Sequence, residues 1–297
     1  MAIWPRVIVA SMAAALVALA QPAHAQPQQR AVYASALDQS GEPAIGLGES
    51  DFVVREDRVA RELLTVVPAT DPMQIALLVD NSQAAEQYIL NYRDALTTFI
   101  RTIGDDPSGA HHEIAVITVG ERPTINTDYT TNLDQAIKGV QRIFPTPGSG
   151  SYLLDGIIET VQGMRRRESA RPVIVAVTTG GPELSGRVYQ QVLEPLQDFG
   201  AAFHVVWIGS PSTANQDRQL VLDGGTRFSG GRYDTVLAGS ALSGRMKELA
   251  TELINQYKIT YARPQTLIPP ERVTVGAARP GLTVRGIAAR ETGTNRR

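Results

Sequence analysis

The chain of 297 residues contains no cysteine. Disulfides, thiolate metal sites and thiol nucleophiles are therefore excluded, and so is a lipid anchor on a cysteine at a cleavage site. An excess of charge of one sign is also missing, since 28 basic and 30 acidic residues leave a formal net charge of −2. This balance gives no general attraction to nucleic acid or to an anionic membrane surface. Stability must then come from a hydrophobic core, which a chain of this length can form.

Long apolar runs are scarce, and the longest lies at the start of the chain. Arg6 precedes an apolar stretch over residues 7–20, and Ala23-His24-Ala25 then supplies a small-x-small sequence. This order predicts a cleavable signal peptide over residues 1–25, cut near Ala25. The alternative is an uncleaved anchor, although the stretch is short for a membrane span of about 20 residues. We expect an exported protein, periplasmic or secreted, with no membrane span after signal cleavage.

The remaining chain follows two patterns. Residues 26–70 contain short strand-like runs separated by turn-forming residues. Over residues 71–256, apolar strands at 75–79, 113–119, 172–178 and 202–208 alternate with amphipathic helical patterns at 85–103, 133–143, 153–164, 188–199 and 240–256. This alternation predicts an α/β fold with a doubly wound, mostly parallel sheet. Residues 257–290 are again strand-like, so we expect a small β module formed from the N- and C-terminal segments. Residues 291–297 are expected to be a disordered tail.

The end of the first apolar strand carries the most informative polar residues. Residues 75–79 are an unbroken apolar run, and Asp80-Asn-Ser82-Gln-Ala84 follows directly. Ligands of parallel sheets bind just beyond the carboxyl ends of the strands, where Asp80 and Ser82 are expected to lie. A carboxylate and a hydroxyl are ligands suited to a hard cation such as Mg²⁺.

This arrangement resembles the von Willebrand factor A (VWA) domain, and the resemblance covers about residues 74–256. The family's metal-ion-dependent adhesion site is written Asp-x-Ser-x-Ser, followed by a distant Thr and a distant Asp. Asp80 and Ser82 match the first two members, and Ala84 stands where the second Ser would be. Ser151, within Gly-Ser-Tyr-Leu-Leu-Asp, takes the place of the Thr, whereas Thr179 replaces the second acidic residue.

The flanking segments extend the resemblance to nearly the whole chain after the predicted cleavage, residues 26–297. Asp51-Phe-Val-Val-Arg-Glu-Asp57, Gly224-Gly-Thr-Arg-Phe228 and Asn255-Gln-Tyr257 resemble motifs of a bacterial, secreted VWFA-related subfamily of the Acidobacteria type.

The resemblance implies a protein-interaction module of the adhesion type, with a degenerate metal site. Asp80, Ser82 and Ser151 are the residues left to hold a metal. The loss of one carboxylate and one hydroxyl favours no bound cofactor, with a weakly held Mg²⁺ as the alternative. The partner is expected to be a protein of the cell envelope or extracellular space, and not nucleic acid. The rim that would contact it comprises Asp80, Ser82, Ala84, Ser151, Tyr152, Thr179 and Glu183.

Two other functions stay open. Ser82 could serve an exported serine hydrolase on an α/β fold, because the histidine and aspartate partners of such a serine are often dispersed in sequence. The chain lacks the Gly-x-Ser-x-Gly elbow of one large hydrolase class, and nothing in the sequence places a histidine beside Ser82. A structural envelope component without a discrete site is the third option. The sequence favours a protein that is not an enzyme.

Overall fold

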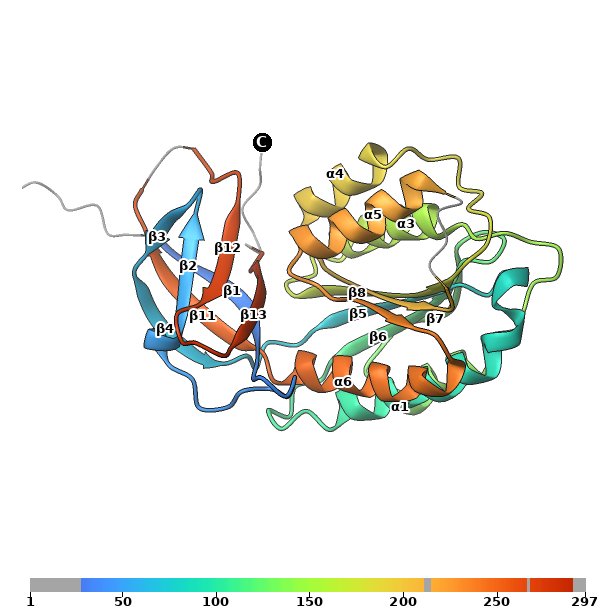
Figure 1. The fold of residues 1–297 in the computed structure, drawn as a ribbon, viewed down its shortest axis with the longest axis horizontal. Coiled ribbons are helices and arrows are strands. Elements are labelled where there is room, and N and C mark those ends of the chain that lie inside the picture. Colours follow the sequence, from blue (N-terminus) through green and yellow to red (C-terminus); the bar gives the residue numbers. More distant parts are fainter. Residues whose placement is uncertain (1–27, 211–214, 266–267, 291–297) are drawn as a thin grey trace, which may run out of the picture.

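The computed structural model describes residues 28–210, 215–265 and 268–290. The predicted signal peptide over residues 1–25 and the predicted tail over residues 291–297 lie outside the described residues. Figure 1 shows two parts side by side, a β module and a larger domain in which helices cover both faces of a sheet. This arrangement confirms the predicted fold class.

The sheet of the larger domain has six strands in the order β10-β9-β8-β5-β6-β7. All neighbours pair in parallel except β6 and β7, which are antiparallel. The strands are β5 (Gln74–Val79), β6 (Glu113–Thr118), β7 (Thr124–Thr130), β8 (Pro172–Thr179), β9 (Ala202–Ile208) and β10 (Tyr233–Val236). The chain adds β6 and β7 on one side of β5 and then returns to add β8, β9 and β10 on the other side. The direction in which strands are added therefore reverses beside β5. Such a switch point is where open α/β sheets usually bind ligands.

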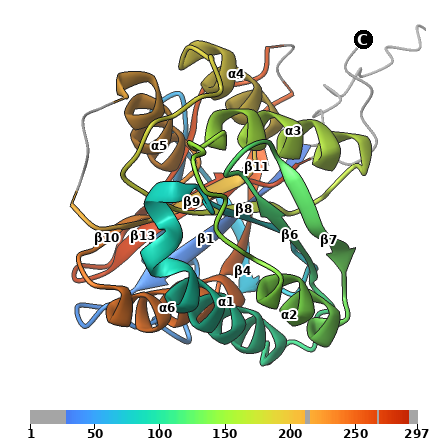
Figure 2. The ribbon, with the colours of Figure 1, turned by 90° about the vertical axis from the view of Figure 1, so that its right-hand side faces the viewer.

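Helices cover both faces of this sheet (Figures 1 and 2). One layer contains α1 (Ile89–Gly104), α2 (Leu133–Gln141) and α6 (Leu242–Ile254), and the other contains α3 (Leu153–Arg166), α4 (Gln190–Phe199) and α5 (Gln216–Phe228). Alternate side chains of β5 enter opposite cores, Ile75 and Leu77 with the first layer and Ala76 and Leu78 with the second. Both faces of β5 are thus buried, which explains its unbroken apolar sequence.

The β module consists of two antiparallel sheets built from both ends of the described chain. The first has the order β13-β1-β11-β4 and the second the order β12-β2-β3. The strands are β1 (Gln28–Leu37), β2 (Phe52–Glu56), β3 (Val59–Arg61), β4 (Leu63–Pro68), β11 (Tyr257–Arg263), β12 (Val273–Ala277) and β13 (Thr283–Ala288). Val32, Phe52 and Tyr257 lie in the core that the two sheets share.

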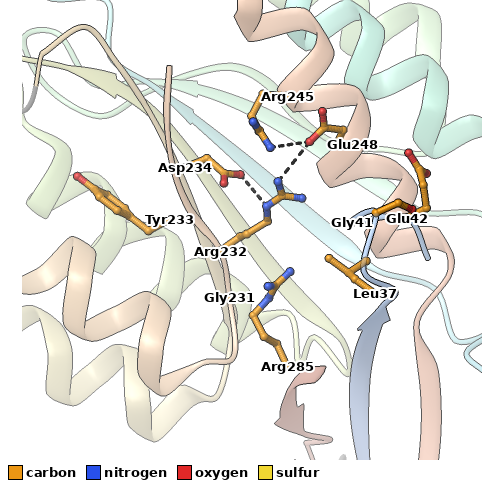
Figure 3. A pocket seen from close by; sticks show the side chains of 11 residues that line it. Leu37, Gly41, Glu42, Gly231, Arg232, Tyr233, Asp234, Arg245, Glu248 and Arg285 are labelled. Carbon is orange, nitrogen blue, oxygen red and sulfur yellow. Dashed lines mark hydrogen bonds and ion pairs between the residues drawn. The ribbon is translucent and has the colours of Figure 1, made fainter. Parts of the chain in front are cut away.

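A cavity of about 520 Å³ lies where the module meets the larger domain, between the end of β1, β10, α6 and β13. Figure 3 shows charged side chains converging on it. Three arginines line the cavity, and each is already paired with a carboxylate: Arg232 with Asp234 at 2.7 Å, Arg245 with Glu248 at 2.6 Å, and Arg285 with Glu252 at 2.7 Å. We therefore regard this region as a charged seam between the two parts of the protein.

The structure differs from the sequence prediction at several elements. The helix expected from residue 85 begins as a 3₁₀ turn, Gln83–Tyr88, and becomes α-helical at Ile89. Strands β7 and β10 and helix α5 were not predicted. Two further short 3₁₀ turns, Glu49–Asp51 and Gly239–Ala241, connect elements. Within the described part of the chain, no helix has the length and apolar character needed to cross a membrane.

Candidate functional site

The carboxyl ends of β5, β6 and β8 lie next to one another and bring the predicted site residues together. Asp80 follows β5, Thr179 ends β8, and Tyr152 donates its backbone N–H to Val119, which follows β6, at 2.7 Å. Figure 2 views the molecule onto this edge of the sheet, which faces away from the β module. We call it the carboxyl edge.

Asp80 is directed inward and organises the loop that follows it. Its side chain is 1% exposed. One carboxylate oxygen accepts the backbone N–H of Ser82 at 3.0 Å, and the other accepts the hydroxyl of Thr178 at 3.0 Å. The carboxylate thus connects the end of β5 to the end of β8. Ser82 is equally buried.

Position 84 lies against the loop between β8 and α4. A Cβ on Gly181, whose φ is +143°, would come within 2.7 Å of the Ala84 Cβ. Only glycine readily adopts this conformation, and it also permits the close approach of the loop. The residue that lacks a hydroxyl here therefore lies in close contact with a neighbouring loop but remains partly exposed.

Ser151 and Glu183 form a single parallel bridge between the start of α3 and this same loop. The backbone N–H of Ser151 donates to Pro182 at 2.8 Å, and the N–H of Leu184 donates to the Ser151 carbonyl at 2.7 Å. The Ser151 hydroxyl is buried and has no hydrogen-bond partner among the described residues. The predicted metal set contains two hydroxyls, those of Ser82 and Ser151. Among the described residues, the Ser151 hydroxyl is the one of the two that is fully buried without a hydrogen-bond partner.

Thr179 does not take over the role of an acidic ligand. Its hydroxyl donates to the carbonyl of Ile208 at the end of β9, at 2.7 Å. The side chain therefore serves the neighbouring strand.

Glu183 turns its carboxylate inward toward a buried arginine of α5. The side chains of Glu183 and Arg218 are each 2% exposed, and their charged groups lie 4.0 Å apart. The other Glu183 oxygen accepts the Ser185 hydroxyl at 2.5 Å and the N–H of Leu154, in the first turn of α3, at 3.4 Å. Burial raises the pKa of Glu183, while Ser185 and Arg218 act to lower it. The attraction of Arg218 thus offsets only part of the cost of burial.

The Arg218 side chain contacts three groups of the site. Its guanidinium donates to the carbonyl of Thr179 at 3.3 Å and lies 5.0 Å from the centre of the Trp207 ring. Glu183 is the third. Arg218 was missed by the sequence analysis, although its spacing to Val221, Leu222 and Gly225 is that of a buried helical face, and all four residues are buried.

The residues present do not fit a tightly held divalent cation. Asp80 is the single carboxylate of the predicted metal set, and both its oxygens already accept hydrogen bonds. Ala84 offers no ligand, and the Thr179 hydroxyl is committed to a carbonyl. Over the described residues, no three or more His, Asp or Glu side chains form a group able to hold a metal. Mg²⁺ can be held by one carboxylate and several waters, but such a site is weak.

The described histidines lie elsewhere. His112 accepts the backbone N–H of Met73 and pairs with Asp106 at 2.7 Å, at the amino edge of the sheet. His204 lies within β9 and accepts the N–H of Arg232. In the part of the chain that the structure describes, no hydrogen bond links Ser82 to a histidine.

Two large apolar side chains are exposed at the carboxyl edge. Phe144 is 62% exposed and Leu184 is 49% exposed. Gln83 and Pro182 are also exposed, whereas Tyr152 is half-buried. The edge therefore has a buried polar interior and an outer rim that is partly apolar.

An open α/β sheet with polar loops at its switch point defines a broad class of ligand-binding and protein-binding domains. Comparison with known families identifies one family within this class, because the family model of the von Willebrand factor type A domain matches residues 74–232. The chain belongs to this family. A search of curated proteins gave no match.

Solved structures of similar fold come from several organisms. A von Willebrand factor type A protein from Catenulispora acidiphila is 12% identical, with a TM-score of 0.50 over 92% of this chain and 78% of that one. Proximal thread matrix protein 1 from the mussel byssus is 15% identical, with a TM-score of 0.50 over 67% of this chain and 50% of that one. The von Willebrand factor domain of a type V pilus tip protein from Porphyromonas gingivalis is 10% identical, covers 62% of this chain and 96% of its own, and has a TM-score of 0.47. At these identities the similarity concerns the fold.

Proposed function

We propose that the protein is an exported, non-enzymatic interaction module that binds a protein partner at the carboxyl edge without a tightly held metal ion. The observation that carries this proposal is the exposure of Phe144 and Leu184 on loops that are fixed from within. Large exposed apolar side chains that are held in place are typical of protein-binding surfaces, in which aromatic anchors contribute much of the affinity.

Phe144 is held from two sides. The guanidinium of Arg93 lies 4.7 Å from the centre of its ring, and the Asn81 amide donates to its carbonyl at 2.8 Å. Leu184 is held by the backbone N–H that it donates to Ser151. Side chains that are ordered before binding lose less conformational entropy when a partner arrives.

The predicted rim residues then have two roles. Ala84 and Tyr152 are partly exposed and can contribute contact area. The buried side chains of Asp80, Ser82, Ser151 and Thr179, with the inward carboxylate of Glu183, support the loops instead.

The remaining parts of the proposal rest on the sequence. The signal peptide predicted over residues 1–25 supports a periplasmic or secreted location, and hence a partner in the envelope or extracellular space. The flanking motifs support the bacterial, secreted VWFA-related subfamily. Membership of the VWA family supports an interaction module rather than an enzyme.

Affinity capture from native envelope extracts, with and without EDTA, tests the function. The double variant Phe144→Ala/Leu184→Ala should retain at most about a tenth of the captured partner, since each anchor contributes on the order of 1 kcal/mol or more. EDTA should leave capture unchanged. The control is Ile125→Ala, because Ile125 is as exposed as Phe144 but lies on β7. Equal capture by the double variant and the control would refute the assignment of the surface.

A further inference from the structure

We infer that Arg218 is the resident cation of the carboxyl edge: its guanidinium, rather than a divalent ion, holds the β8–α4 loop against the start of α3. The inference deepens the proposed function, on which its biological meaning rests, because it explains how the rim can be formed before any metal or partner binds.

The position of Arg218 among the segments that a metal ion would connect is the first argument for the inference. A VWA metal would draw together ligands from the ends of β5 and β8 and from the start of α3, which are Asp80, Thr179 and Ser151 in this chain. Arg218 contacts the second of these segments directly, through the Thr179 carbonyl at 3.3 Å. It reaches the third through Glu183, which lies 4.0 Å from the guanidinium and opposite Ser151 in the bridge.

The charges carry the second step. A buried arginine is always protonated, so it needs a nearby carboxylate to offset its loss of hydration. Glu183 supplies that charge, and the same carboxylate accepts the N–H of Leu154 in the first turn of α3. The positive end of the α3 dipole favours a carboxylate at this place. Arg218 is therefore linked to the start of α3 in two steps, by an ion pair to Glu183 at 4.0 Å and by the hydrogen bond that Glu183 accepts from Leu154 at 3.4 Å.

The rest of the loop is tied to α3 in the same region. The Ser185 hydroxyl accepts the N–H of Asp155 at 3.1 Å, and the Arg187 guanidinium donates to the Asp155 carboxylate at 2.7 Å. Trp207 supports the Arg218 guanidinium from β9. These contacts hold the loop against α3 through side chains and backbone groups of the chain itself.

Hydrogen exchange measures the order of the loop directly. The reporters are the amides of Ser151 and Leu184, which donate across the bridge. In Arg218→Met both should exchange at least about tenfold faster than in wild type. The matched control is Arg227→Met on the same helix, since the Arg227 side chain is 76% exposed and forms a surface ion pair with Asp223. Unchanged exchange in Arg218→Met would overturn the inference.

A second variant covers the case in which Arg218→Met fails to fold. Glu183→Gln keeps the shape of the side chain and removes its charge, so it should accelerate exchange of the same two amides by a similar factor. Wild-type exchange in Glu183→Gln would also overturn the inference.

Metal titration distinguishes a resident cation from a merely structural arginine. The double variant Ala84→Ser/Thr179→Asp restores the two missing ligands. Its Kd for Mg²⁺ should nevertheless stay in the millimolar range, because the charge of Arg218 is still present. Adding Arg218→Met should lower the Mg²⁺ Kd at least about tenfold, because the competing charge is then removed. Micromolar binding with Arg218 in place, or equal affinities in the two backgrounds, would overturn the inference. None of these measurements involves the partner, so their outcome is independent of the capture experiment.

Discussion

Replacing Glu252 with glutamine should weaken the connection between the larger domain and the β module. Glu252 lies in α6, and its carboxylate is 1% exposed. It accepts two hydrogen bonds from Arg285 of β13, at 2.7 and 2.8 Å, and one from Arg232, at 3.2 Å. Glutamine keeps the size of the side chain but removes the charge and turns one acceptor into a donor that faces a guanidinium.

The size of the effect follows from what each arginine retains. Removing one member of a fully buried ion pair costs about 3–5 kcal/mol. Arg232 keeps Asp234 at 2.7 Å and Glu248 at 3.3 Å, and Arg285 is 25% exposed, so water can solvate part of its charge. We therefore expect a loss of about 2–3 kcal/mol in the free energy of unfolding. For a protein of this size this corresponds to a Tm lower by roughly 5–10 °C.

Chemical and thermal unfolding measured side by side provide the assay. The control is Glu248→Gln, one turn earlier in α6, because Glu248 binds Arg232 and Arg245 but is 50% exposed. That variant should lose less than about 1 kcal/mol. If Glu252→Gln were no less stable than Glu248→Gln, the seam would not hold the two parts of the protein together.

The pH dependence gives the same prediction a second check. Burial acts to raise the pKa of Glu252, but Arg285, His204 and Arg232 outweigh it and the pKa is lowered. A carboxyl whose pKa is lower in the folded protein contributes stability above its unfolded pKa of about 4.3, and this contribution disappears as the pH falls through the folded pKa. The difference between wild type and Glu252→Gln should therefore be largest at neutral pH and narrow below about pH 4.

Three further predictions concern acid sensitivity, metal and processing. Burial lowers the pKa of His204 to about 4. As the pH falls, the unfolded chain therefore binds a proton before the folded protein does, and the free energy of unfolding should fall by about 3 kcal/mol between pH 6.5 and 4. His204→Gln should lose most of this pH dependence in unfolding titrations, and an unchanged pH dependence would contradict the assignment to His204. Calorimetric titration of wild type with Mg²⁺ or Mn²⁺ should show no binding tighter than the millimolar range, whereas a micromolar site abolished by Asp80→Ala would contradict the proposed metal independence. Intact-mass analysis of the exported protein should give an N-terminus at Gln26, and retention of residues 1–25 would refute the predicted cleavage.

The fold was predictable wherever burial imposes a pattern. Strands β5, β8 and β9 are buried along their whole length and appear as apolar runs, and α1 presents a regular apolar face. Strand β7 escaped because it is a polar edge strand with the sequence TINTDYT, in which only Thr127 is fully buried. Helix α5 escaped because its inward face includes an arginine and a glycine beside only two aliphatic residues. A hydrophobic pattern cannot reveal a face of that composition.

The candidate site was predictable in place but not in orientation. The position of Asp80 follows from strand periodicity and from the general location of sites in parallel sheets. That Thr179 turns to the Ile208 carbonyl and that Glu183 turns inward depends on partners more than 20 residues away. Arg218 was not identified from the sequence, because a charged residue at a helical position is usually exposed and the apolar pattern of α5 is weak.

The internal partners of the carboxyl edge also determine how it can act on another protein. In a metal-bridged interface, a carboxylate of the partner completes the coordination shell, so the ion supplies both affinity and direction. Here Asp80 is already bound to Ser82 and Thr178, and Glu183 lies beside Arg218. Within the described residues, the edge therefore already pairs its buried charges inside the chain. What it offers is Phe144 and Leu184, held by Arg93, Asn81 and Ser151. Under the proposed function, recognition by such a rim would depend on apolar complementarity and on loops ordered in advance, and it would be insensitive to divalent ions.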